Sequence, residues 1–306
     1  MKQIYVIGIL SLASSLFSAC EDINEGGGKN YNTEVEVTFA SKIVAYDSND
    51  TEEWVGGESV GVFMKKNKAG FAAEDIVNGV SNRRLIADAD GSLCVPENEP
   101  SIIFQQDASK VDFVLYHPWL EILPENGIPV DVSNPENKEK YGTLYSNNAT
   151  GKYKSQSPVK VEFRHIPAKI ILEMTNGTGV EAEDLRSLQV EARGVYTAGL
   201  LALDTGIVTP AGNIGTISVP VSDDGRHAEY VVLPTNELPS SGRDLRFTFT
   251  VKDIDIAQTY RFDENLRFEM GKQYTLDVVI ANPGIEVTIR TIEDWIVDDE
   301  TGDAVL

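Results

Sequence analysis

The chain has 306 residues, and its 48 acidic against 26 basic side chains give a formal net charge of −22 at pH 7. Such a charge repels the phosphates of nucleic acid and the anionic face of a membrane. It therefore argues against any anionic partner that a protein binds through basic side chains. The length is enough for two domains of ordinary size.

Residues 1–19 have the organisation of an export signal that ends at a cysteine. Lys2 supplies a positive start, and the apolar run Ile4–Phe17, at about 14 residues, is too short to span a bilayer as a helix. Two small residues then precede Cys20, as in the lipobox of bacterial lipoproteins. We predict that the signal peptide 1–19 is removed and that Cys20 is lipidated (palmitate), so that the acyl chain anchors the protein in a membrane. The alternative is a plain secretory signal with an incidental cysteine.

The stretch 20–32 is acidic and glycine-rich, and we expect it to be a flexible tether. Acidic residues directly after the cysteine resemble the surface-export signal of Bacteroidetes lipoproteins, which implies a place on the outer membrane at the cell surface. Once Cys20 carries lipid, Cys94 is the remaining cysteine, so no disulfide can form within the chain. We expect Cys94 to be a small packed thiol, because its neighbours in the sequence offer no base.

Apolar and polar residues alternate in several segments after the tether. A two-residue period places the apolar side chains on one face of a strand, which must then pack on a second sheet. Helical periodicity is scarce, and only Ala182–Ser187 is typical of a short helix. Together with the turn-rich dipeptides between the segments, this pattern predicts an all-β protein built from β-sandwiches. The predicted strands are Val35–Phe39, Val60–Met64, Val111–Leu115, Val159–Phe163, Ile170–Met174, Leu188–Val190, Phe247–Val251, Leu276–Ile280 and Ile285–Ile289.

A polar stretch in the middle of the chain suggests a domain boundary. Asp131–Ser157 is rich in Asn, Lys, Ser and Gly, and strand-like sequence resumes at Val159. We therefore predict an N-terminal β-sandwich at residues 33–158 and a C-terminal β-sandwich at residues 159–306.

Short motifs that match catalytic or metal-binding patterns lack the context that the chemistry needs. Gly57–Gly61 has the G-x-S-x-G spacing of a nucleophile elbow, but the residues that follow the serine predict a strand instead of a helix. Asp204–Gly206 matches one aspartic-protease triplet without a second, and we expect a β-turn there. Asp88–Gly91 and Asp298–Asp303 lack the closing glutamate of a calcium loop, and we expect solvated turns.

The histidines also give no sign of a site. His117, His165 and His227 are isolated and lack metal-ligand spacing. We therefore predict a protein that is not an enzyme, with no catalytic residue, no cofactor and no metal.

Several segments in chain order resemble the fimbrillin family of Bacteroidales, the major and minor subunits of surface pili. The first matches are a strand, a tryptophan followed by Gly-Gly-Glu, and a strand that contains Val-Phe. The middle matches are an Asp-Phe strand that ends in Tyr-His-Pro-Trp and a Phe-x-His-x-x-Ala-Lys strand, and the last are Gly-Lys-x-Tyr and Ile-x-x-Trp. The segments are Val35–Phe39, Trp54–Met64, Val111–Trp119, Phe163–Ile170, Met270–Leu276 and Ile292–Trp295.

The resemblance implies two tandem transthyretin-like (Greek-key) β-sandwich domains and a role in adhesion as a subunit of a pilus (fimbria), with other pilin subunits as partners. Pilins of this family travel as lipoproteins, and a protease cuts after the first strand, which then leaves a groove. A C-terminal strand of another subunit fills the groove by strand addition.

Carried over to this chain, the leaving strand is Glu34–Ala40. The family protease is specific for arginine, but the first arginine is Arg83, so Lys42 is the candidate processing residue. The absence of an arginine after the strand favours an acyl chain that stays on Cys20, as in an anchor or accessory subunit.

The candidate donor strand is Ile285–Val297, with Ile285, Val287 and Ile289 on one face, and an ordinary last strand of the second sandwich is the alternative. For the whole protein, the alternative is a surface lipoprotein that does not polymerise and binds a glycan or a host protein. A glycan site needs exposed aromatic rings, whereas the three tryptophans lie in apolar strand patterns and are expected in the core. These are Trp54, Trp119 and Trp295.

Overall fold

The computed structural model describes residues 34–45, 52–107, 109–125, 127–135, 142–234, 243–263 and 265–293. These residues form strands and turns almost throughout, which confirms the all-β prediction. The exceptions are three single-turn 3₁₀ helices, one of which, Asp184–Ser187, lies where a short helix is predicted. In the part of the chain that the structure describes, no helix has the length and apolar character to cross a membrane.

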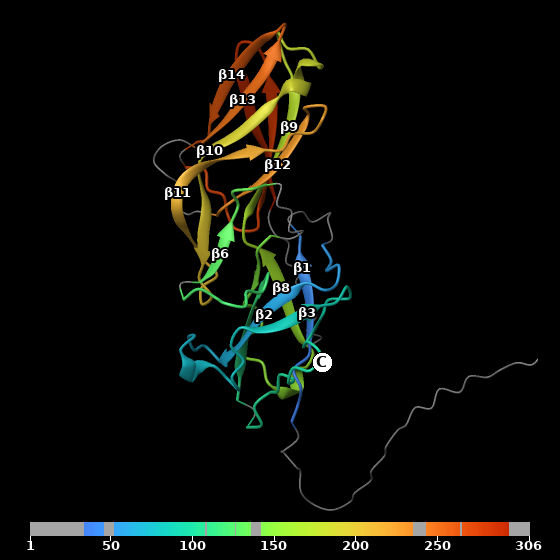
Figure 1. Cartoon of the computed structure of the whole chain (residues 1–306), viewed down its shortest axis with the longest axis vertical. Helices are drawn as coiled ribbons and strands as arrows, with labels where there is room; N and C mark the ends of the chain where they lie inside the picture. Colours follow the sequence, from blue (N-terminus) through green and yellow to red (C-terminus); the bar gives the residue numbers. More distant parts are fainter. Residues whose placement is uncertain are drawn as a thin grey trace, which may run out of the picture. The chain divides into compact units, whose positions relative to one another are not determined.

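Seven strands from the first part of the chain close into a barrel in the order β1-β4-β3-β2-β5-β7-β8, and Figure 1 labels β1, β2, β3 and β8 of them. The first strand closes this barrel, because β1 pairs antiparallel with β4 on one side and parallel with β8 on the other. The strands are β1 (Phe39–Val44), β2 (Ser59–Lys66), β3 (Arg83–Ala87), β4 (Ser92–Cys94), β5 (Val111–His117), β7 (Leu144–Ser146) and β8 (Val159–His165).

The other strands form two sheets. One has the order β11-β10-β13-β14, and the other has the order β12-β9-β15-β16 with β16 at its edge. A short strand, β6, pairs antiparallel with the end of the long β10 and so extends the first of these sheets. The strands are β6 (Ile128–Asp131), β9 (Ala168–Asn176), β10 (Gln189–Leu201), β11 (Val208–Val219), β12 (His227–Val232), β13 (Asp244–Val251), β14 (Ile254–Arg261), β15 (Gln273–Ile280) and β16 (Ile285–Glu293).

The central strand β5 is buried on both faces, although its alternating sequence predicts one buried face. Val111, Phe113 and Leu115 belong to the apolar cluster inside the barrel. Val114 and Tyr116 belong instead to the large cluster between the two other sheets. All seven residues of β5 are therefore buried, because on its outer face Val114 and Tyr116 pack against apolar side chains and Asp112 is covered by the loops that it hydrogen-bonds.

The predicted division at residues 158 and 159 does not coincide with the change of sheet. It assigns β8 to the second domain, but β8 pairs with β1 and β7 in the barrel. The predicted polar linker also contains β7, whose three residues are buried. Sheet membership depends on pairing between segments far apart in the sequence, so composition alone misplaces both strands.

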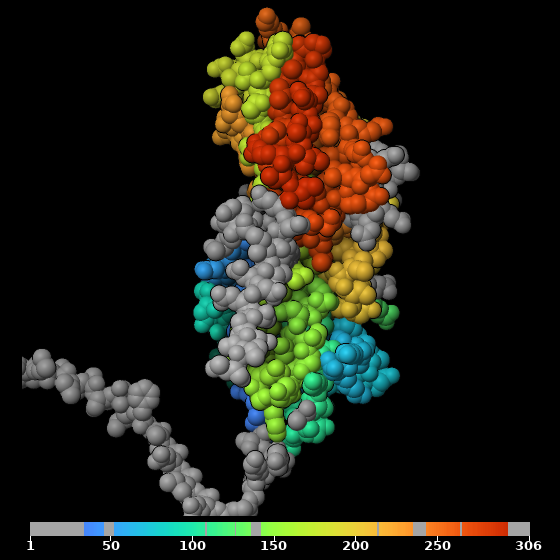
Figure 2. All heavy atoms as spheres, turned by 180° about the vertical axis from the view of Figure 1, so that it is seen from behind, coloured from blue at the N-terminus to red at the C-terminus, as the bar shows by residue number. Residues whose placement is uncertain are grey.

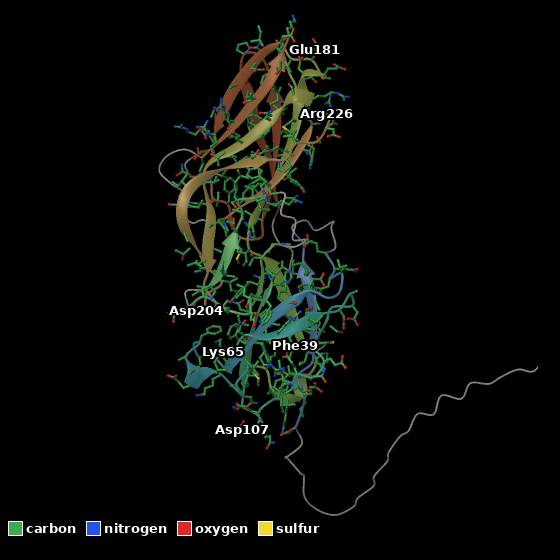
Figure 3. The ribbon with its side chains drawn as sticks, in the orientation of Figure 1. Phe39, Lys65, Asp107, Glu181, Asp204 and Arg226 are labelled. Carbon is green, nitrogen blue, oxygen red and sulfur yellow. The ribbon has the colours of Figure 1, made fainter. Side chains whose placement is uncertain are left out.

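The turn predicted at Asp204–Gly206 is confirmed at the tip of the β10–β11 hairpin (Figure 3). The N–H of Gly206 donates to the carbonyl of Ala202 at 2.8 Å, and the Tyr145 hydroxyl donates to the carbonyl of Leu203 at 2.6 Å. A side chain at Gly206, whose φ is +70°, would place its Cβ 2.7 Å from the Tyr145 ring. The triplet Asp204–Gly206 is thus a turn that packs on Tyr145, and it is not a catalytic motif.

Candidate functional site

The backbone of β1 fills a slot between β4 and β8. Phe39 and Ala40 pair with Leu93 and Ser92 on one side, while all six residues of β1 pair with the stretch 159–164 on the other. The chain just before β1 is paired too, since the Val37 N–H donates to the Ile102 carbonyl at 2.8 Å. Removal of this segment would leave unpaired backbone groups on both neighbouring strands.

The side chains of β1 and of the residues just before it supply part of the barrel core. Val37, Phe39 and Ile43 are 4%, 4% and 6% exposed, and they alternate with outward-facing residues. The Phe39 ring, labelled in Figure 3, packs edge-on against Phe113 at 5.2 Å between ring centroids. The slot is therefore a row of apolar sites that a strand fills with every second side chain.

One inward-facing position of the slot is polar. The Ser41 hydroxyl donates to the Gly91 carbonyl at 2.7 Å and accepts a hydrogen bond from the Trp54 indole N–H at 3.0 Å. The Ser41 N–H also donates to the Gly91 carbonyl at 2.7 Å. The approach requires a glycine, because a Cβ at Gly91 would lie 2.3 Å from the Ser41 carbonyl oxygen.

The Gly91 turn belongs to the acidic motif Asp88–Gly91, which connects β3 and β4. The Gly91 N–H donates to the Asp88 carbonyl at 2.9 Å, and the Asp90 carboxylate accepts from the Ser92 N–H at 2.9 Å. The described residues contain no cluster of three or more His, Cys, Asp and Glu side chains that could hold a metal. The turn thus orients the Gly91 carbonyl toward β1.

The candidate processing residue Lys42 lies within β1 and not after it, because the strand extends four residues beyond the predicted end at Ala40. Its ammonium group forms an ion pair with Glu162 of β8 at 3.2 Å, with about half of the Lys42 side chain exposed. Its backbone is in register with Glu162 as well. A protease needs an extended segment in its own cleft, so a cut at Lys42 requires β1 to leave the sheet first.

The candidate donor residues Ile285, Val287 and Ile289 all lie in β16, which pairs antiparallel with β15. Their side chains are half-buried against the large cluster between the two sheets. The red atoms of β16 form part of the surface in Figure 2. The described chain ends at Glu293, so the rest of the predicted donor strand, the tail motif and Trp295 lie outside the described residues, as does Cys20.

The elbow-like motif Gly57–Gly61 contains the start of β2 and no helix follows it. The Ser59 hydroxyl accepts from Arg84 Nε at 3.0 Å, and His117 Nδ1 faces the backbone carbonyl of Ser59 instead of its hydroxyl. The arrangement is that of a strand end and not of a nucleophile with its base.

Cys94 is exposed, so the expectation of a packed thiol is wrong. The residue ends β4 and its thiol donates to the Asp88 carboxylate at 3.3 Å. Partial burial and this contact raise the pKa of the Cys94 thiol, which lowers the fraction present as reactive thiolate.

Asp112, in β5, organises the loops at one end of the barrel. Its carboxylate accepts from the N–H groups of Lys68 and Gly151 at 2.7 and 2.8 Å, and from the Asn67 amide at 2.7 Å. Lys65 lies 3.4 Å away. Burial raises the pKa of Asp112, but the three hydrogen bonds and the nearby charge outweigh it and hold the pKa below the ordinary value.

Two described tryptophans differ in burial. Trp54 is 3% exposed and packs edge-on against Phe163, as the core prediction requires. Trp119 is partly buried, and its face is covered by the guanidinium of Arg84 at 5.4 Å. Neither ring forms the open platform that a glycan would need.

Sequence reasoning found the strand but missed its polar anchor. The predicted strand Val35–Phe39 covers only the start of the paired segment, and Ser41 carries no motif. The bond between Ser41 and Trp54 joins residues 13 positions apart, and its geometry also depends on the Gly91 turn. No local signal in the sequence could have revealed it.

The fold and the slot together define a class of protein, an all-β protein whose barrel is closed by its own first strand. The sequence model of the Fimbrillin-like family matches residues 45–295, beginning one residue after β1 ends. The chain belongs to this family, which confirms the predicted resemblance. The family is one of fimbrial and adhesion subunits rather than enzymes.

Individual proteins agree with the family match. The "Putative fimbrium subunit Fim1C" of Bacteroides uniformis is 26% identical over 99% of both chains. The crystal structure of a "putative cell adhesion protein" from Bacteroides uniformis ATCC 8492 has a TM-score of 0.67 at 26% identity and covers 86% of this chain and 99% of its own. A second such structure, from Bacteroides ovatus ATCC 8483, shares the fold with a TM-score of 0.66 at 21% identity, over 87% of this chain and 100% of its own.

Proposed function

We propose that this chain is a cell-surface fimbrial subunit that takes part in adhesion and assembles with other pilin subunits by strand exchange at the β1 slot. The observation that carries the proposal is the position of β1. It is the first strand of the described chain and yet lies between two paired neighbours in a closed barrel. A first strand can leave without unthreading any other part of the chain.

An empty slot would bind a new strand strongly. Departure of β1 exposes the edges of β4 and β8, and it uncovers the apolar sites of Val37, Phe39 and Ile43. Unpaired edges recruit strands through backbone hydrogen bonds, and apolar sites then select alternate side chains. The barrel and the two-sheet region correspond, in this proposal, to the two transthyretin-like sandwiches of the family.

The attachment to the cell is part of the proposal. Cys20 carries an acyl chain, and the acidic stretch 20–32 spaces the domain from the outer membrane. The acyl chain stays on because no arginine follows β1 before Arg83, so in this proposal β1 leaves the slot while it is still joined to Cys20 through the tether. The placement of Lys42 inside β1 supports retention, because the candidate processing residue is held in the barrel by pairing with Glu162.

The anchor is tested by metabolic labelling with an alkyne fatty acid in a Bacteroides host. Cys20→Ser should abolish the label, while the matched control Cys94→Ser keeps it, because Cys94 lies in the folded barrel. Full labelling of Cys20→Ser would contradict the anchor. Mass spectrometry of the native N-terminus shows whether the acyl chain stays or the chain begins after β1.

Strand exchange is tested by locking β1 in place. Lys42 and Glu162 are direct partners across β1 and β8, so the variant Lys42→Cys/Glu162→Cys, in a Cys94→Ser background, can form a disulfide between them. Limited proteolysis after β1 should turn the unlocked mature chain from monomer into oligomers on size-exclusion chromatography. The oxidised, locked variant should stay monomeric and oligomerise only when reductant is added.

The controls are the two single-cysteine variants, which should assemble like the unlocked chain in either redox state. Oligomers of the oxidised, locked variant at the level of these controls would show that β1 does not need to leave, and the strand-exchange proposal would fail.

A further inference from the structure

Two strands that are far apart in the chain carry the same seven-residue pattern. Residues 35–41 read Val-Glu-Val-Thr-Phe-Ala-Ser, and residues 285–291 read Ile-Glu-Val-Thr-Ile-Arg-Thr. Glu, Val and Thr are identical at the second, third and fourth positions, and the first, fifth and seventh pairs keep their chemical character. The first segment leads into β1 and the second forms most of β16.

Every inward-facing residue of the first segment has a counterpart of similar character in the second. In the slot, Val37 and Phe39 face the barrel core and Ser41 forms the polar anchor. The same positions of the second segment hold Val287, Ile289 and Thr291. Ala40, which faces outward, corresponds to Arg290, and an exposed position tolerates such a change.

The hydroxyl group at the Ser41 position hydrogen-bonds the Gly91 carbonyl and the Trp54 indole. When β1 leaves, the Gly91 carbonyl loses both of its Ser41 donors, and the Trp54 indole, whose side chain is buried, loses its Ser41 acceptor. Buried polar groups that lose their partners are costly, so the slot favours a strand that replaces the hydroxyl. A threonine can do so, because it carries the same donor and acceptor as serine.

We propose that the β1 slot selects a strand with a hydroxyl side chain at the Ser41 position. The strand that occupies it is β16 of a second copy of this chain, with Thr291 at that position. Val287 then takes the Val37 site and Ile289 takes the Phe39 site. This inference rests on the proposed strand exchange and adds the register, the direction and the polar anchor to it.

The geometry of β1 agrees with this register, whereas β16 carries a bulge at Arg290, between its pairs Ile289–Leu276 and Thr291–Thr275, which must straighten when the strand enters the slot. The incoming strand runs in the direction of β1, parallel to β8, and brings Thr288 to the place of Thr38, whose hydroxyl lies 2.8 Å from the Ser157 hydroxyl. β16 is an edge strand with half-buried apolar side chains, so its release uncovers less apolar surface than release of a central strand. The match ends at Thr291, because the same register would bring Glu293 to the buried apolar site of Ile43. The incoming strand must therefore leave the slot after Thr291, and the Val35–Ser41 sites carry the recognition.

The test is displacement of β1 from the full mature chain. A specific protease site replaces residues 46–51, and a dye on the N-terminus reports the loss of the cut N-terminal fragment. Synthetic peptides of residues 285–297 then compete with β1, as the natural sequence or with Thr291→Ser, Thr291→Val or Arg290→Ala. Valine has the shape of threonine without its hydroxyl, and Arg290→Ala is the control for an outward-facing position.

The natural and Thr291→Ser peptides should displace β1 at similar concentrations, and Arg290→Ala should differ by less than about twofold. Thr291→Val should need about tenfold more peptide, the effect of one buried hydrogen bond lost. With Trp54→Phe in the barrel, which removes the indole N–H, the difference between threonine and valine should shrink. Equal displacement by the Thr291→Val and natural peptides overturns the polar anchor.

A second arm separates the inference from the proposed function. Peptides of residues 34–45, natural and with Ser41→Val, are added back to the cut chain after its own fragment has been removed by dilution. A loss of about tenfold for Ser41→Val supports the hydroxyl anchor independently of any donor from another copy, whereas equal rebinding overturns it. If the 34–45 peptide rebinds but no 285–297 peptide displaces β1, the assignment to β16 is wrong and another subunit is the donor.

Discussion

The strands β1 and β16 share a sequence pattern but differ in how the fold holds them. β1 lies between two neighbours, and the side chains of Phe39 in β1 and of Val37 just before it are almost fully buried. β16 has one neighbour, β15, and its apolar side chains are half-buried. Nearly the same residues can therefore be the closing strand of one core and the removable edge of another, because the number of paired neighbours decides how much a strand contributes.

The largest expected difference between the two strands lies in their apolar side chains. Phe39→Ala should lower the free energy of unfolding by about 3–5 kcal/mol, since a buried ring leaves a cavity. Ile289→Ala should lower it by roughly 1–2 kcal/mol, because that side chain is only partly buried in the natural chain. Urea denaturation followed by fluorescence measures both.

Where Phe39→Ala does not fold, Phe39→Leu provides a milder comparison at about 1 kcal/mol. Equal losses for Phe39→Ala and Ile289→Ala would contradict the different roles of the two strands. A loss for Ile289→Ala above that of Phe39→Ala would make β16 the more firmly held strand and would count against its release.

Lowering the pH should have an effect of intermediate size on the free energy of unfolding, through Asp112 in the barrel. The pKa of Asp112 is held below the ordinary value of about 3.9 in the folded state. A lowered folded pKa contributes stability above the unfolded pKa, and this contribution is lost as the pH falls through the folded value. The barrel should thus keep this contribution at neutral pH and lose it below about pH 4.

Asp112→Asn should lower the free energy of unfolding by about 2 kcal/mol at pH 7, since an amide cannot accept hydrogen bonds with both of its groups. The variant and the natural chain should converge in stability below about pH 4. A constant difference from pH 7 to pH 3, measured by urea denaturation, would show that the carboxylate charge is not the cause. Asp255→Asn, at an exposed edge strand, is the control.

The smallest effect should come from the surface ion pair of β1. Lys42→Ala removes the 3.2 Å contact with Glu162 and should change the free energy of unfolding by less than about 1 kcal/mol, because exposed pairs are weak. The backbone pairing of β1 should instead protect Lys42 from a lysine-specific protease. Rapid cleavage at Lys42 in the natural chain, at the rate of the Phe39→Ala variant, would show that β1 opens without weakening of its core contacts.

The alternating segments predicted most strands whose side chains alternate between core and solvent. They missed β6 and β12, which also alternate, and they missed strands that the fold places in another environment. The exposed edge strand β14 and the Pro- and Gly-containing β11 have weak patterns, and the three-residue β7 lies in polar sequence. Strand pairing compensates for weak local preference in each of these, since the neighbouring strands supply the hydrogen bonds.

In the candidate site, too, the sequence predicted some features and missed others. The sequence predicted β1 as the first strand and Ile285, Val287 and Ile289 as one apolar face, because a period of two is a local property. It placed the end of β1 too early, because the residues from Ser41 to Val44 are held in β1 by long-range pairing with β8.

The sequence by itself determined the all-β class, the presence of a strand near each end of the described chain, and the resemblance to the fimbrillin family. These follow from side-chain periodicity and from short motifs, which need only neighbours in the chain. The tertiary structure alone decided that β1 closes a barrel, that β8 belongs to it, and that Ser41 meets Trp54 and Gly91. Those facts depend on which distant segments pair, and the free energy of pairing comes from burial and hydrogen bonds that no local segment contains.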